Sequence, residues 1–117
     1  MDTIQNSSRP DTMEQILIGQ LIVPKDAVKE FYERLNINRN FIKNLPGFIE
    51  DNVYERTDEQ GNIIVISVAT WENGAAIKNA KGAVQAEYKR EGFDMQAMLK
   101  RLNITIASDA LYIKVKN

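Results

Sequence analysis

Two short segments of this 117-residue chain are almost continuously apolar and rich in β-branched residues. They span 15–23 and 63–71; Pro24 follows the first, and a polar turn containing Gly61 precedes the second. Such runs predict strands, and their lack of alternation predicts strands that are covered on both faces. This requirement constrains the fold most, because a domain of about 100 residues has few elements with which to cover two faces.

The apolar period changes to three and four residues in the intervening segments, as is typical of amphipathic helices. Helices are predicted at 25–45, 74–90 and 95–102, and further strands at 48–56 and 104–115, where Asp109 marks a candidate break. The order β-α-β-β-α-α-β is that of the ferredoxin-like split βαβ fold, an α+β class in which helices cover one face of an antiparallel sheet.

The other face of that sheet has no cover, although both central strands offer apolar side chains to it. No further element is available, since residues 1–13 are polar and predict a disordered tail before a single domain at 14–117. A second copy of the sheet is the expected cover. We therefore expect a homodimer in which two sheets pack face to face through the open sheet face.

The composition removes whole classes of chemistry. Without Cys or His, the chain has no disulfide, no thiolate nucleophile, no His-dependent triad and none of the usual zinc or haem ligands, so neither a metal nor a cofactor is expected. A net charge of −1 argues against binding to nucleic acid or to an anionic membrane. No apolar run approaches the ~20 residues of a membrane helix. The first residues lack the apolar core of a signal peptide, so we expect a cytoplasmic protein.

Three short motifs mark the junctions between the predicted elements. They are Val23-Pro24-Lys25, Leu45-Pro46-Gly47-Phe48 and Val68-Ala69-Thr70-Trp71-Glu72-Asn73. In this order, and with a short third helix before the last strand, they resemble the antibiotic biosynthesis monooxygenase family of dimeric α+β barrels. The second motif is similar to the family's "epGf" turn and the third to its "W-x-s" signature, and the resemblance spans about Gln15 to Val115.

The resemblance implies one small-molecule pocket per subunit, between the sheet and the helices. Characterised members include cofactor-independent monooxygenases that act on polycyclic phenols or quinols, whereas others degrade haem. The haem-degrading members bind iron through a His on the second helix, near Lys81 here, so the absence of His argues against that activity. The resemblance therefore implies a cofactor-independent monooxygenase of a small aromatic, phenol-like or quinol-like substrate.

Trp71 and Gln20 are the catalytic candidates. A Trp at the end of the third strand shapes the pocket of the oxygenating members, which matches Trp71; this residue could equally be a packing residue. An Asn on the first strand of several members falls nearest to Gly19, with Gln20 beside it. The Gln20 amide could bind a phenol or carbonyl oxygen, or face a dimer interface or solvent.

The substrate-binding candidates lie on the predicted helices and are Phe31, Tyr32, Asn38 and Tyr88. Asn38 interrupts an apolar line and could line a wet cavity, but the sequence around it favours a local break in the helix. The aromatic candidates could instead pack in the core with satisfied hydroxyl groups. Lys81 could be a cation near the pocket, but the favoured placement is a solvated face of the second long helix.

Two other functions remain open. The chain could be a non-enzymatic dimer that binds a small apolar ligand or serves as a stress or interaction module. It could also run another reaction on the same barrel, such as lactone isomerisation or a dehalogenating lyase step, although neither a His nor a paired carboxylate is evident. A cavity of roughly 300 Å³ or more with convergent polar groups would favour ligand chemistry. Filling by Phe31, Leu35, Ile77 and Met side chains would favour a structural role.

Overall fold

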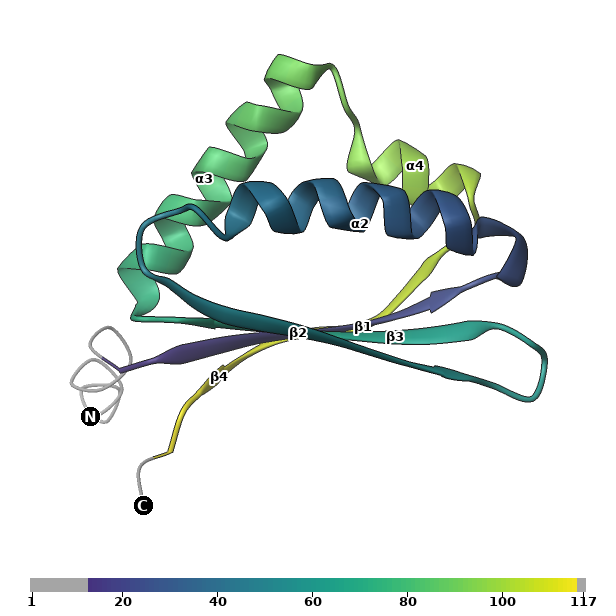
Figure 1. Ribbon diagram of the computed structural model, residues 1–117, viewed down its shortest axis with the longest axis horizontal. Helices are drawn as coiled ribbons and strands as arrows, with labels where there is room; N and C mark the ends of the chain where they lie inside the picture. Colours follow the sequence, from purple (N-terminus) through teal and green to yellow (C-terminus); the bar gives the residue numbers. More distant parts are fainter. Residues whose placement is uncertain (1–12, 116–117) are drawn as a thin grey trace, which may run out of the picture.

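A computed structural model describes residues 13–115 of the chain (Figure 1). The elements are β1 (Gln15–Val23), a 3₁₀ turn η1 (Lys25–Ala27), α2 (Val28–Ile42), β2 (Phe48–Thr57), β3 (Ile63–Trp71), α3 (Gly74–Glu91), α4 (Met95–Arg101) and β4 (Thr105–Ile113). This order confirms the predicted α+β plan. The disordered tail predicted for residues 1–13 falls almost wholly outside the described residues.

The four strands form one antiparallel sheet in the order β2-β3-β1-β4, and all helices lie on one face of it (Figure 1). β1 and β3 pair along their full length, from Gln15 opposite Trp71 to Val23 opposite Ile63. Because side chains alternate between the faces of a strand, the odd-numbered residues of these two strands face the helices.

The even-numbered residues of the same strands form an apolar open face, as predicted. The residues concerned are Ile16, Ile18, Ile22, Ile66 and Val68, while Ile64 on the same face is only 5% exposed. No other element of residues 13–115 covers this face (Figure 1). On the flanking strands, the side chains of Tyr54 and Tyr112 are 57% and 52% exposed.

The core between the helices and the sheet consists of two clusters. The Phe31 cluster comprises Val23, Ala27, Phe31, Val65, Met98, Leu99 and Ile104. The Trp71 cluster comprises Trp71, Ile77 and Ala80, with Leu17, Ile42, Leu45, Phe48, Ala69 and Ala76 packed against them. α4 contributes to the first cluster and α3 to the second, so the two helices cover opposite ends of the sheet.

The predicted break in the first helix is wrong. α2 is continuous from Val28 to Ile42 and ends slightly before the predicted Leu45. The Asn38 side chain accepts a hydrogen bond from Arg34 Nε at 3.1 Å and donates one to the Tyr88 hydroxyl at 2.9 Å. Its amide is satisfied by other side chains and so does not compete for the helix backbone.

The other helix ends follow local sequence signals. Asn73 caps α3 by accepting a hydrogen bond from Ala76 N, and Asp94 caps α4 by accepting one from Ala97 N. Gly92 ends α3 with φ +69°. β4 continues through Asp109, and its pairing with β1 instead shifts between Gln20 and Leu21. No helix within residues 13–115 is long and apolar enough to cross a membrane.

Candidate active site

The turn before β2 locks the first turn of α3 against the sheet. Gly47 has φ +83°, and a Cβ at this position would lie 2.4 Å from the Ala76 Cβ, so only glycine fits. The backbone N–H of Glu72 donates to the Gly47 carbonyl at 2.9 Å. This contact brings Phe48 to the end of β3.

Trp71 is the last residue of β3 and is 3% exposed. Its ring meets Phe48 edge to face, with centroids 5.3 Å apart and planes at 82°. The indole Nε1 is buried and has no hydrogen-bond partner among the described residues. Such an unsatisfied buried donor costs about 1–3 kcal/mol.

A cavity of about 260 Å³ lies beside this indole, between the sheet and the two long helices. Its lining residues are Leu17 on β1, Ile42 on α2, Trp71 on β3, and Ile77, Ala80, Lys81, Val84 and Gln85 on α3. The walls are apolar apart from Lys81 and Gln85. An apolar cavity with a few polar groups is the usual form of a small-molecule site.

The path of α3 leaves this end of the layer unfilled. α3 begins at the sheet and rises away from it, whereas α2 runs along the sheet (Figure 1). On the sheet below, Gly19 lies opposite Ser67, and both positions face the helices. These two positions of the central strands therefore add no large side chain to this layer.

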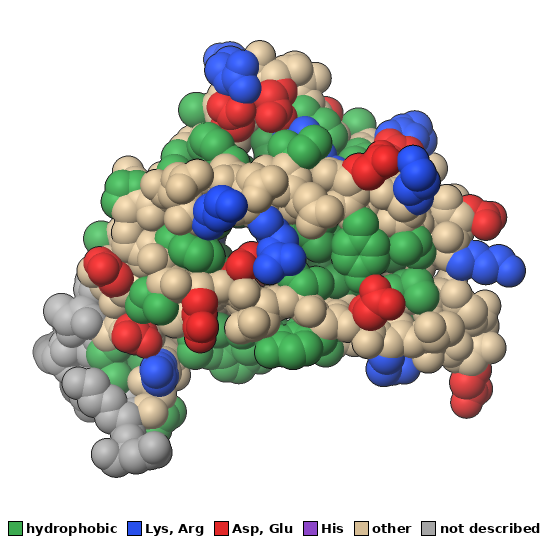
Figure 2. Space-filling model, viewed as in Figure 1, with side chains coloured by type: hydrophobic (Ala, Val, Ile, Leu, Met, Phe, Trp, Pro, Cys, Tyr) green, Lys and Arg blue, Asp and Glu red, His purple; other side chains and the backbone are tan. Residues whose placement is uncertain are grey.

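A second, polar hollow lies beneath α2 on the β2 side, where Figure 2 shows an opening bordered by basic and acidic side chains. It measures about 360 Å³ and is lined by Asn36, Arg39, Asn40, Lys43 and Asp51. Arg39 donates two hydrogen bonds to the Asp51 carboxylate, from Nε at 2.7 Å and from NH2 at 3.1 Å. The hydrogen bond to Asp51 raises the pKa of Arg39. This ion pair ties α2 to β2.

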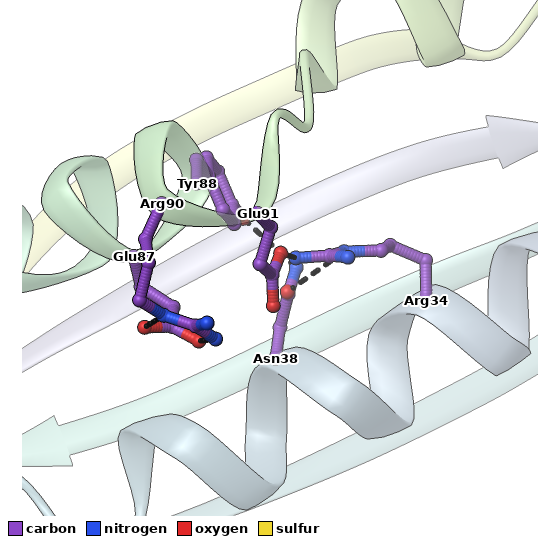
Figure 3. A network of polar contacts seen from close by, with 6 residues as sticks. All are labelled: Arg34, Asn38, Glu87, Tyr88, Arg90 and Glu91. Carbon is purple, nitrogen blue, oxygen red and sulfur yellow. Dashed lines mark hydrogen bonds and ion pairs between the residues drawn. The ribbon is translucent and has the colours of Figure 1, made fainter.

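A polar network joins α2 to the C-terminal half of α3 (Figure 3). Arg34 donates to Glu91 at 2.6 Å, and its guanidinium lies 3.7 Å from the Phe93 ring centroid and 5.2 Å from that of Tyr88. Burial raises the pKa of Tyr88, although the Arg34 charge acts in the opposite direction. The space left here is only about 10 Å³, so the network is a structural tie.

The cavity contains Trp71 but none of the other predicted site residues. Gln20 faces the open side of the sheet, on the opposite face from Trp71. Phe31 is 6% exposed within its own cluster, and Asn38 bonds Tyr88 in the tight α2–α3 crevice.

Tyr32, the remaining candidate, packs at the edge of the Phe31 cluster. Its hydroxyl donates to the Glu55 carboxylate on β2. Burial, followed by this hydrogen bond, raises the pKa of Tyr32 to about 12. Tyr32 therefore joins α2 to the sheet away from the cavity.

Of the two polar residues that line the cavity, Lys81 but not Gln85 is considered in the sequence analysis. Lys81 is exposed, as expected of a solvated helix face, yet it also lines the cavity. Gln85 was missed, although it follows Lys81 by one helical turn and flanks the apolar line of Ile77, Ala80 and Val84. Within residues 13–115, no group of three Asp or Glu side chains could hold a metal ion.

Comparison with known proteins places this geometry in a family. The profile of the antibiotic biosynthesis monooxygenase family matches residues 15–88. Because the match covers more than half of the chain, the chain belongs to this family, and the resemblance noted in the sequence is confirmed. No curated protein matches the sequence significantly.

Solved structures share the fold at low sequence identity. SnoaB, a cofactor-independent oxygenase from Streptomyces nogalater, has a TM-score of 0.66 at 19% identity, covering 90% of this chain and 96% of that one. A dimeric ferredoxin-like protein from an uncultured marine organism has a TM-score of 0.68 at 6% identity, covering 90% and 98%. A conserved protein from Methanosarcina mazei Go1 has a TM-score of 0.66 at 14% identity, covering 89% and 95%.

Proposed function

We propose that this protein is a monooxygenase that oxidises a small aromatic, phenol-like or quinol-like substrate in the cavity beside Trp71. The observation that carries the proposal is the cavity itself: about 260 Å³, apolar, and walled by a buried indole whose N–H has no partner among the described residues. Family membership supports oxygenation as the reaction, and SnoaB shows that the same fold hosts a cofactor-independent oxygenase.

The chemistry asks little of the protein beyond binding and orientation. An electron-rich aromatic, once deprotonated, can itself pass an electron to O₂. For an anthrone-type substrate, the reacting methylene loses two hydrogens and gains one oxygen atom, and the second oxygen atom leaves as water. The protein would hold the ring against Trp71, exclude bulk water, and offer the indole N–H to a substrate oxygen.

The cavity favours this proposal over a purely structural module. A structural role predicts filling by Phe31, Leu35, Ile77 and Met side chains. Phe31 and the buried Met98 belong to the other cluster, and Ile77 lines the cavity without closing it. The polar groups at the cavity are Lys81 and Gln85 in place of the predicted Gln20.

Oxygen uptake tests the proposal directly. With a panel of anthrone-type and naphthol-type substrates, the wild-type protein should consume one O₂ per substrate oxidised. Trp71→Phe removes the indole N–H and part of the wall, and should lower the rate about tenfold or more. Ile37→Ala, which shortens an exposed side chain on α2 outside the cavity, should match the wild type. No uptake across the panel would reject the proposal.

We further propose that two copies of the chain pack through the open sheet face. Support comes from the apolar even-numbered residues of β1 and β3, since a single sheet leaves them without a covering element. One structural relative is described as dimeric. The face-to-face packing of two such sheets would give the closed barrel of the family.

Light scattering after gel filtration tests the dimer. The wild type should have twice the chain mass at micromolar concentration. Ile18→Lys places a charge in the centre of the open face and should yield a monomer, whereas Ile37→Lys, on an exposed position of α2, should remain a dimer. A monomeric wild type would refute this interface.

A further inference from the structure

The cavity presents hydrogen-bond donors and a positive charge, but no negative charge. Its polar lining consists of Lys81 and Gln85, one turn apart on α3. No Asp or Glu lines it. Trp71 contributes part of the apolar wall. A ligand that complements this lining carries acceptors and negative charge on an apolar body.

Lys81 is available to pair with such a ligand. Within residues 13–115 it forms no ion pair or side-chain hydrogen bond. Its neighbours one turn away on α3 are Ile77, Lys78, Val84 and Gln85, so no carboxylate of its own helix competes for it. Arg34, Arg39, Arg90 and Arg101 are, in contrast, each paired with a carboxylate.

We propose that the cavity takes its aromatic substrate as an anion, a carboxylate or phenolate whose charge lies against the Lys81 ammonium group while the ring rests against Trp71. This inference rests on the proposed function, because it names the substrate class of the same cavity. An unpaired anion would be costly next to apolar walls. The exposed Lys81 supplies a counter-charge at the cavity edge, where the anion also keeps contact with water.

The same placement serves the proposed reaction. A nearby cation favours the charged form of an acid, so Lys81 would promote loss of the phenolic proton to solvent. The phenolate is the electron-rich form that can reduce O₂. Lys81 would thereby select the substrate and also hold it in its reactive protonation state.

A pair of probes with the same shape separates charge from fit. We would measure binding of 2-naphthoate and of neutral 2-naphthamide by isothermal titration calorimetry. The wild type should bind the naphthoate about tenfold more tightly, the scale of one charge-assisted hydrogen bond. Lys81→Met should abolish this preference and leave the naphthamide affinity unchanged. Lys81→Arg should retain most of the preference.

Lys78→Met is the matched control, because it removes the same charge from the same helix at a position that does not line the cavity. It should keep the wild-type preference; an equal loss in Lys78→Met would attribute the effect to the general field of the helix and overturn the proposal. Equal affinity of the wild type for both probes would overturn the charge inference and leave the cavity as the site. Binding of neither probe would overturn this inference, whereas oxygen uptake that depends on Trp71 would still support the proposed function.

Discussion

The two ends of the layer between the helices and the sheet are built from the same elements but are packed differently. In the Phe31 cluster, Val23 and Val65 are completely buried, and α4 closes the layer from above. In the Trp71 cluster, Trp71 and Ile77 are buried, yet a cavity of about 260 Å³ lies beside them. One end of the layer is thus filled by side chains, while the other end contains open space.

The difference follows from the path of the chain after β3. α3 starts at the Trp71 end and rises away from the sheet, and the chain then returns as α4 over the Phe31 end (Figure 1). The Arg34–Glu91 ion pair holds the far end of α3 to α2 (Figure 3). The hollow is therefore braced by polar contacts above it and is not filled by side chains.

Phe31→Ala should give the largest loss of stability. The ring is 6% exposed and central to the closed cluster, so its removal should lower the free energy of unfolding by about 3–5 kcal/mol. Urea denaturation measures this value. Ile37→Ala, at a side chain that is 49% exposed, should change stability by less than about 0.5 kcal/mol. Similar effects at the two positions would contradict the assignment of the core.

Arg34→Met should have the next largest effect, because it removes the brace above the cavity. The Arg34 and Glu91 side chains are only 13% and 21% exposed, and the guanidinium also stacks on Phe93. We expect a loss of about 2–3 kcal/mol in urea denaturation. Arg90→Met breaks a pair whose Arg side chain is 70% exposed and should cost at most about 1 kcal/mol. Equal losses of stability in the two variants would show that the Arg34–Glu91 pair contributes no more than an exposed ion pair.

Two matched alanine substitutions probe the packing of the two ends. Ala27 and Ala80 are 3% and 5% exposed, but only Ala80 lines the cavity. Ala27→Leu should overpack the closed cluster and cost about 1–3 kcal/mol. Ala80→Leu should fill existing space at little cost to stability, and should block binding of 2-naphthoate. Equal destabilisation by the two substitutions would show that the Trp71 end is not hollow in solution.

The smallest expected effect is a pH dependence at the closed end. The pKa of Tyr32 is raised from 10.0 to about 12, first by burial and then by the hydrogen bond to Glu55. Folding therefore favours the neutral phenol, and this contribution is fully present below pH 10 and is lost as the pH rises to about 12.

Urea denaturation between pH 9 and pH 12 tests this effect; these limits bracket the two pKa values of Tyr32. The stability of Tyr32→Phe should decline less steeply than that of the wild type. Glu55→Gln should retain part of the slope, because burial is the larger cause. Identical slopes for the wild type and Tyr32→Phe would exclude Tyr32 as the source.

The strands and their order were predictable because their signals are local. β1 and β3 begin and end at the predicted residues, since β-branched runs are bounded by Pro24 and by the turn at Gly61. The apolar open face also follows from the sequence, because alternation within a strand is fixed at two residues. Trp71 is a candidate through the family resemblance, because the oxygenating members have a Trp at the end of the third strand.

The rest of the site depends on contacts between distant segments. The break predicted at Asn38 fails because its amide binds Tyr88, fifty positions further along the chain. Gln20 was paired with Trp71 as a catalytic residue, but the β1–β3 register puts the two on opposite faces of the sheet. Gln85 carries no motif, and only the packing of α3 over the sheet brings it to the cavity.

The sequence by itself determined the fold class, the apolar pattern of the two central strands, the helix caps and the absence of Cys and His chemistry. These features depend on residue type and on spacings of a few residues. The tertiary structure decided where the layer is closed and where it is hollow, and which side chains meet Trp71. The physical reason is that a cavity is set by the angle at which α3 leaves the sheet, and that angle results from long-range contacts such as Gly47 with Ala76 and Arg34 with Glu91.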